Sequence, residues 1–260
     1  MSRAGAFLPL AQLRPGDAFP PLEAAWPARS PAPGLLAVGG ALDAATLRRA
    51  YAGAIFPWFS PGEPLLWWST DPRMVLPVQQ FRLRRSLRQA IRRFRATPGC
   101  ELRFDSAFAQ VMQACASAPR PGQTGTWITP EMRAAYTDLH AEGAAHSVEL
   151  WAQGELVAGL YLVSLGRAVF GESMFTRVRD GSKIALAALV AFCRAHGLPL
   201  IDCQQNTAHL ASLGAAEMPR ARFAAQVAAL SQQSAPRWQF EPQLWRELEP
   251  PAAVQQQESA

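Results

Sequence analysis

The stretch HSVELWAQGELVAGLYLVSLGRAVFGESMF, residues 146–175, decides the fold. It contains three runs rich in apolar and β-branched residues, and such runs are typical of strands. Gly154 and Gly166 lie at the two interruptions, where glycine favours a tight turn. The stretch therefore predicts three consecutive strands that pair as an antiparallel meander.

The segments after the meander predict a helix and a further strand. TRVRDGSK, residues 176–183, is a loop that opens a helix over residues 183–196. Ser182 is the expected N-cap of this helix, and Gly197 is the residue expected to stop it. LPLID, residues 198–202, follows as a strand.

The chain divides into a small front part and a larger back part. Residues 1–72 predict a small N-terminal domain of turns and short strands around one helix over residues 44–52, capped by Asp43. Residues 73–246 alternate between strand and helix patterns and predict a mixed domain. The polar, proline-bearing residues 247–260 predict a disordered tail.

Composition excludes several classes of protein. The 260 residues are 49% hydrophobic and 17% charged, which fits an ordinary globular protein. No apolar run approaches the length of a membrane span, and no signal peptide is evident, so we expect a cytoplasmic protein without membrane contact. The four cysteines form no CxxC pair and have no metal-ligand spacing with the histidines, so we expect no metal and no disulfide framework.

Positive charge is concentrated in FRLRRSLRQAIRRFR, residues 81–95. Its apolar residues fall at helical spacing, and no acidic residue offsets its seven arginines: Arg82, Arg84, Arg85, Arg88, Arg92, Arg93 and Arg95. A run of charge on a helix is most often a solvated face. Because this helix repels itself unless anions neutralise it, and because the net charge of the chain is +5, the pattern favours contact with nucleic acid phosphates.

Carboxylates on two neighbouring elements point to a cleft. Glu172 lies in the last strand of the meander, and Asp202 lies at the end of the next strand, followed by Cys203 and Gln204. The helix start near Lys183 offers backbone N–H groups and positive charge for an anion. The alternative interpretations are that Lys183 is merely solvated and that residues 202–204 are a strand end turning polar at the surface.

Tryptophans in the front part suggest a second kind of contact. Trp58 lies between prolines in FPWFSPGEP, residues 56–64, where a large aromatic side chain in a loop more often serves a ligand. A nucleotide base is one candidate, because bases stack on aromatic rings. Trp67 and Trp68 are adjacent in a short strand, so at least one of them is expected in the core.

Five segments resemble, in order and spacing, the bacterial leucyl/phenylalanyl-tRNA–protein transferases. They are GLLAVGGALDAATLRRAYAGAIFPWFSPGEPLLWWSTDPRMVL (34–76), TWITPEMRAAYTDLHAEGAAHSVELW (126–151), FGESMF (170–175), GSKIAL (181–186) and LIDCQQNTAHLASLGAAEMPR (200–220). The resemblance implies an α+β fold: a small N-terminal domain and a GNAT-like acyltransferase domain whose mixed, largely antiparallel sheet is flanked by helices.

The resemblance also implies an activity. Leucine or phenylalanine, and in some cases methionine, passes from its tRNA to the α-amino group of a protein that begins with Arg or Lys, and the product is degraded as an N-degron. The aminoacyl ester is already activated, so the reaction requires no cofactor. We expect a monomer whose partners are aminoacyl-tRNA and acceptor proteins. The alternatives are a GNAT-type N-acetyltransferase that uses acetyl-CoA and a non-catalytic RNA-binding module.

Residue roles follow from the matching positions. Asp202 is expected to orient the attacking amine or to accept its proton, and Gln204 to hold the amine or the carbonyl. Glu172 is expected either to pair with the cationic side chain of the acceptor or to support Asp202. The apolar residues expected near the amino-acid pocket are Leu160, Val169 and Phe175. The aromatic residues expected to contact the terminal adenosine are Trp58 and Trp127. The tRNA phosphates are expected at Arg82, Arg84, Arg85, Arg88, Arg92 and Lys183.

Overall fold

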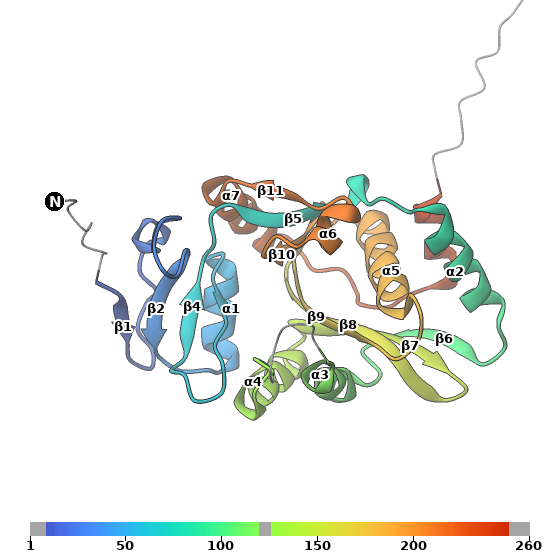
Figure 1. The fold of residues 1–260 in the computed structure, drawn as a ribbon, viewed down its shortest axis with the longest axis horizontal. Coiled ribbons are helices and arrows are strands. Elements are labelled where there is room, and N and C mark those ends of the chain that lie inside the picture. Colours follow the sequence, from blue (N-terminus) through green and yellow to red (C-terminus); the bar gives the residue numbers. More distant parts are fainter. Residues whose placement is uncertain (1–8, 120–125, 250–260) are drawn as a thin grey trace, which may run out of the picture.

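The computed structural model describes residues 9–119 and 126–249, which form two sheets (Figure 1). The smaller sheet has the strand order β1-β2-β4-β3. Its strands are β1 (Ala11–Leu13), β2 (Leu35–Gly39), β3 (Phe56–Pro57) and β4 (Leu66–Trp68). Helix α1 (Ala44–Ala52) packs beside this sheet, and the Asp43 carboxylate accepts the Thr46 N–H as the predicted N-cap.

The larger sheet has seven strands in the order β11-β5-β10-β9-β8-β7-β6. They are β5 (Arg73–Pro77), β6 (Cys100–Phe104), β7 (Ala145–Ala152), β8 (Glu155–Leu165), β9 (Ala168–Thr176), β10 (Leu200–Gln204) and β11 (Ala216–Met218). Strands β7, β8 and β9 form the predicted meander. Among the described strands of this larger sheet, β9 and β10 pair in parallel and the other neighbours pair antiparallel. The predicted α+β class with a mixed, largely antiparallel sheet is therefore confirmed.

Helices cover both faces of the larger sheet. They are α2 (Arg85–Ala96), α3 (Phe108–Ser117), α4 (Pro130–Ala141), α5 (Gly181–Ala195), α6 (Ala208–Ser212) and α7 (Arg220–Ser231), with 3-10 turns η1 (Leu22–Ala24), η2 (Val78–Gln80) and η3 (Pro242–Leu248). Figure 1 shows α5 on one face of β7, β8 and β9, and α3 and α4 on the other. Side chains on β8 alternate accordingly: Leu160 packs in the core under α5, and Tyr161 packs in the core under α3 and α4.

The prediction for the start of α5 was wrong. The helix begins at Gly181, and Ser182 lies in its first turn, so Ser182 is not the N-cap. The residue before the helix is Asp180, whose backbone is left-handed with φ of 61° and whose side chain makes no cap hydrogen bond. A Cβ at Gly181 would lie 2.6 Å from both Ala158 Cβ and Thr176 Oγ1, so close packing of the helix end on the sheet requires glycine here.

The arginine-rich helix is shorter than predicted. Helix α2 begins at Arg85, so Arg82 and Arg84 lie in the segment that leads into it. The Arg82 backbone N–H donates to Leu213 O at 2.8 Å, which fixes this segment against the chain after α6. Leu87 and Ile91 are buried as the helical spacing requires, and the seven arginines are all exposed.

The N-terminal part and the larger sheet share one hydrophobic core. Leu47, Tyr51 and Trp67 from residues 1–72 pack in the same buried cluster as Tyr136 and Phe170. The division at residues 72 and 73 is therefore a change of sheet within a continuous core.

The chain end also differs from the prediction. Leu248 lies in η3 and is 6% exposed, so the ordered chain continues past residue 247. The rest of the predicted tail, residues 250–260, lies outside the described residues.

Candidate active site

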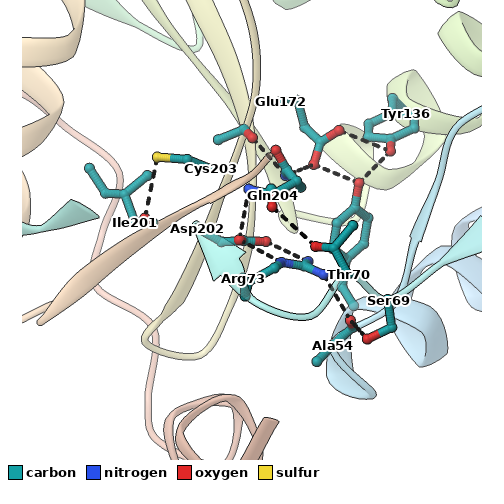
Figure 2. Close-up of polar contacts among 12 residues, drawn as sticks. Ala54, Ser69, Thr70, Arg73, Tyr136, Glu172, Ile201, Asp202, Cys203 and Gln204 are labelled. Carbon is teal, nitrogen blue, oxygen red and sulfur yellow. Dashed lines mark hydrogen bonds and ion pairs between the residues drawn. The ribbon is translucent and has the colours of Figure 1, made fainter. Parts of the chain in front are cut away.

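Strands β9 and β10 bring the predicted polar residues together. Asp202 is in register with Phe170 of β9, and Glu172 lies two residues further along the same strand. Pairing of β10 with β5 shifts register between Asp202 and Gln204, and Gln204 has a left-handed backbone with φ of 54°. The irregular end of β10 therefore turns Gln204 toward Glu172 (Figure 2).

A buried arginine holds Asp202. Arg73 on β5 donates from Nε to Oδ1 at 2.8 Å and from Nη2 to Oδ2 at 2.7 Å, and both side chains are fully buried. The guanidinium lies between the rings of Phe56 and Phe223, at 4.6 and 4.7 Å from their centroids. Such bidentate pairing fixes both the position and the orientation of the carboxylate.

Four hydrogen bonds fix Gln204 in its unusual conformation. Its backbone N–H donates to Asp202 Oδ1 at 3.0 Å, and its carbonyl accepts from Thr70 Oγ1 at 3.1 Å. Its side-chain Nε2 donates to Gly171 O at 2.8 Å and to Glu172 Oε1 at 3.2 Å. A left-handed backbone at such a residue costs about 1–3 kcal/mol, which these contacts offset. Because Nε2 already donates both of its hydrogens within the protein, the side-chain amide oxygen is the group that Gln204 offers to a ligand.

Glu172 is enclosed by tyrosine hydroxyls. Tyr136 of α4 donates to Oε2 at 3.4 Å (Figure 2). Tyr51 of α1 donates to Oε1 at 2.7 Å, and the two hydroxyls contact each other. Burial raises the pKa of Glu172 to about 8; the Asp202 charge adds to the rise, whereas the Tyr51 hydrogen bond and Arg73 oppose it. Burial, followed by the charge of Glu172, raises the pKa of both tyrosines, so both hydroxyls keep their protons.

Two adjoining pockets meet at these groups. The first has a volume of about 270 Å³ and is mostly apolar, with walls from Leu160, Met174, Leu186, Leu189 and Ile201. The second has a volume of about 190 Å³ and is aromatic, with Phe56, Trp58 and Trp127 in its walls. Both pockets are also lined by Glu172, Cys203 and Gln204. Burial raises the pKa of the Cys203 thiol, which keeps it neutral and a poor nucleophile.

The structure brings most, but not all, of the predicted pocket residues together. Leu160, Trp58 and Trp127 line the two pockets. Val169 is in the core under α5 and lines neither pocket. Phe175 packs on the opposite face of the sheet from Leu160, lies under the Arg177 guanidinium, and lines a separate groove beside α3.

Three residues that bind the carboxylates of the site were not predicted from the sequence: Tyr51, Arg73 and Tyr136. Several residues of the pocket walls were not predicted either, among them Phe56, Met174, Leu186, Leu189 and Ile201. The tyrosines lie on apolar helix faces and therefore look like ordinary core residues. Arg73 offered the one usable signal, because an arginine at the start of an apolar strand requires a buried partner.

Positive charge extends from α2 toward the aromatic pocket. The charges of Lys183 and Arg93 contribute to lowering the pKa of Asp180, after the hydrogen bond from Lys183 Nζ at 2.9 Å. Burial, and then the charge of Lys183, lowers the pKa of His209, which is adjacent to Leu210 in the pocket wall. We call the seven exposed arginines at residues 82–95, together with Lys183 at the start of α5, the basic path.

Two further findings concern metals and membranes. Within residues 9–119 and 126–249, no group of three or more His, Cys, Asp or Glu side chains is placed to hold a metal ion. No helix in this part of the chain is long and apolar enough to cross a membrane.

Comparison with known proteins gives the family. A family model described as leucyl/phenylalanyl-tRNA protein transferase matches residues 75–228, and the model of its N-terminal domain matches residues 40–71. The chain belongs to this family. It is therefore an aminoacyltransferase, and the resemblance inferred from its motifs is confirmed.

Individual relatives agree over nearly the whole chain. A leucyl/phenylalanyl-tRNA–protein transferase of Albidiferax ferrireducens is 60% identical over 246 residues, which is 95% of this chain and 97% of the relative. One from Polaromonas sp. is 60% identical over 240 residues, covering 92% and 94%. Among solved structures, FemX matches with a TM-score of 0.42 at 13% identity, over 67% of this chain and 66% of FemX. The GNAT-like assignment of the larger domain stays a prediction.

Proposed function

We propose that this chain transfers leucine or phenylalanine from aminoacyl-tRNA to the α-amino group of proteins that begin with Arg or Lys. The observation that carries the proposal is the pair of adjoining pockets. The apolar pocket suits a leucine or phenylalanine side chain, and it ends at the polar groups of Glu172 and Gln204. The choice of Arg or Lys as acceptor, and any use of methionine, rests on the family resemblance.

The aromatic pocket and the basic path suit the tRNA. Trp58 and Trp127 offer ring faces on which the terminal adenosine stacks, and the pocket adjoins the apolar one, as an amino acid esterified to that nucleoside requires. The exposed arginines of the basic path, with Lys183, contact phosphates of the acceptor stem: Arg82, Arg84, Arg85, Arg88 and Arg92. Such contacts give affinity that depends on salt and little on sequence.

The reaction converts an activated ester into a more stable amide, so the enzyme mainly holds the amine and the carbonyl together. Gln204 accepts a hydrogen bond from the attacking amine through its amide oxygen. Asp202 acts as the positioning residue, because both of its oxygens are held by Arg73 and one also fixes the Gln204 backbone. Glu172 binds the Gln204 amide, which favours support of the site over pairing with an acceptor cation.

The cellular role follows from the substrates. The product carries a leucine or phenylalanine at its N-terminus and is degraded as an N-degron. The enzyme acts as a monomer in the cytoplasm, where aminoacyl-tRNA and newly exposed protein N-termini both occur.

The test is transfer of radiolabelled phenylalanine from Phe-tRNA to a peptide that begins with Arg, with an Ala-initiated peptide as control. Label on the Arg peptide alone supports the proposal, and Met-tRNA in a parallel reaction tests methionine. Gln204→Ala is expected to reduce transfer by about 10-fold or more while Phe-tRNA binding persists. Binding of Phe-tRNA without transfer to either peptide would contradict the proposal.

A further inference from the structure

The carboxyl of Glu172 and the hydroxyls of Tyr51 and Tyr136 form a closed ring of three contacts. Tyr51 meets Oε1, Tyr136 meets Oε2, and the two hydroxyls meet each other. Gln204 Nε2 also donates to Oε1. The ring is built from three elements that are distant in sequence: α1, α4 and β9.

The ring has three contacts, and each of them needs one proton to become a hydrogen bond. With Glu172 ionised, two hydroxyl protons must serve three contacts, so one contact lacks a hydrogen. A third proton on the carboxyl gives every contact its own donor, because a protonated carboxyl donates once and still accepts. The ring therefore has room for one additional proton.

The surrounding charges keep this proton exchangeable. Asp202 on β10 favours the neutral carboxyl, whereas Arg73 on β5 and the Tyr51 hydroxyl favour the ionised form. The balance gives Glu172 a pKa of about 8, close to the value of about 8 for an α-amino group. A matched pair of this kind exchanges a proton with little free-energy cost in either direction. The two tyrosines, with pKa values raised by burial, act as donors and not as bases.

The carboxyl is also in the right place. Glu172 lines both the apolar and the aromatic pocket, beside Gln204. An aminoacyl ester that spans the two pockets has its carbonyl at this junction, which is where the attacking amine arrives. Asp202 lines the apolar pocket but not the aromatic one, and both of its carboxylate oxygens are already bound by the Arg73 guanidinium.

We propose that Glu172, with Tyr51 and Tyr136 as its positioning residues, takes the proton from the attacking amine and returns it to the departing ribose oxygen. This inference rests on the proposed function. The neutral amine forms a bond from nitrogen to the ester carbonyl carbon, and the Glu172 carboxylate accepts one proton from that nitrogen. The bond from the carbonyl carbon to the ribose oxygen then breaks, and the same proton passes to that oxygen. The carboxylate is regenerated and no other reactant is consumed.

The test is the pH dependence of single-turnover phenylalanine transfer to the Arg peptide. The rate of the wild-type enzyme is expected to rise with pH through about 8, because the ionised carboxyl is the active form. Tyr51→Phe removes a hydrogen bond that favours ionisation, so its profile should shift upward by about one pH unit. Tyr136→Phe should shift it in the same direction but less, because its hydrogen bond is longer at 3.4 Å.

Thr70→Val is the matched control. It removes a hydroxyl that binds the Gln204 carbonyl and leaves the donors of Glu172 in place. Its rate falls, but its profile keeps the wild-type midpoint. The ratio of wild-type to variant rates cancels the titration of the peptide amine, because every enzyme receives the same peptide.

Glu172→Gln separates proton transfer from packing. It keeps the shape of the side chain and should reduce the transfer rate by about 10²–10⁴-fold. The infrared band of the protonated carboxyl, in wild-type minus Glu172→Gln difference spectra of the free enzyme, should disappear as the pH rises through about 8.

The outcomes separate two failures. Normal transfer with unshifted profiles in both tyrosine variants, or a carboxyl band that titrates near the ordinary glutamate value, overturns the proton-transfer inference. Absence of transfer by the wild-type enzyme overturns the proposed function itself.

Discussion

Breaking the Arg73–Asp202 pair from one side should destabilise the protein more than removing both partners. The guanidinium donates to both carboxylate oxygens, and neither side chain is exposed. Asp202→Asn or Arg73→Met leaves the remaining charge buried without a counter-charge. Such a change costs about 3–5 kcal/mol of unfolding free energy, whereas exchanging both partners for apolar groups is often neutral or stabilising.

Urea unfolding, followed by tryptophan fluorescence, measures these differences. We expect each single variant to be destabilised by about 3–5 kcal/mol and the double variant Arg73→Met/Asp202→Leu to be destabilised less than either. The exposed pair Arg48–Glu142 provides the control, because Arg48→Met should cost less than about 1 kcal/mol.

Activity should follow a different order from stability. The double variant regains stability but not transfer, because leucine at position 202 offers no oxygen to the Gln204 N–H. If Asp202→Asn and Arg73→Met lose no more unfolding free energy than Arg48→Met, the energetic reasoning is refuted. A double variant with full transfer would refute the positioning role of Asp202.

Four further predictions follow from the site. Glu172→Gln should flatten the pH dependence of the unfolding free energy in urea melts. Between pH 4.5 and about 8, the folded wild-type protein holds a proton on Glu172 that the unfolded chain has released, so its unfolding free energy falls by about 1.4 kcal/mol for each unit that the pH rises. Leu160→Trp should fill the apolar pocket and abolish phenylalanine transfer in the peptide assay, with Phe-tRNA binding largely retained. Arg88→Glu/Arg92→Glu should weaken filter binding of tRNA and lower its salt slope by about 0.7–0.9 for each phosphate that the variant no longer neutralises. Trp58→Ala should raise the KM for Phe-tRNA by about 5–150-fold, which corresponds to the free energy of stacking one base on an aromatic ring.

Local patterns predicted much of the fold and part of the site. The meander and α1 follow from strand-forming runs, glycine turns and the Asp43 cap, all of which act over a few residues. Glu172 was identified as a carboxylate in an apolar strand, and Gln204 as part of the polar run that follows the end of the next strand. Their expected roles came from the family resemblance. The start of α5 was misplaced because it depends on the contact of Gly181 with Ala158, which no local pattern encodes.

Contacts between distant segments explain what the sequence concealed. Tyr51 and Tyr136 fit their helices as core residues, and only the folded chain shows that they face Glu172. The position of Arg73 in an apolar strand indicates a buried partner, but only the folded chain identifies that partner as Asp202.

Strand alternation explains why Phe175 does not line the apolar pocket. Phe175 is one residue beyond Met174 on β9, and successive side chains point to opposite faces of the sheet. Met174, and not Phe175, therefore reaches the apolar pocket beside Leu160. The pairing of β9 with β8 that sets this arrangement is visible only in the structure.

The core shared by the two sheets limits how the protein can be recombined. Tyr51 lies in the N-terminal part, yet it donates to the carboxylate of Glu172 on the larger sheet. A chimera that joins residues 1–72 of one relative to the remainder of another must match both the packing around Leu47 and Trp67 and this hydroxyl. The residues on both sides of this contact must therefore be exchanged together, and neither part is an interchangeable module.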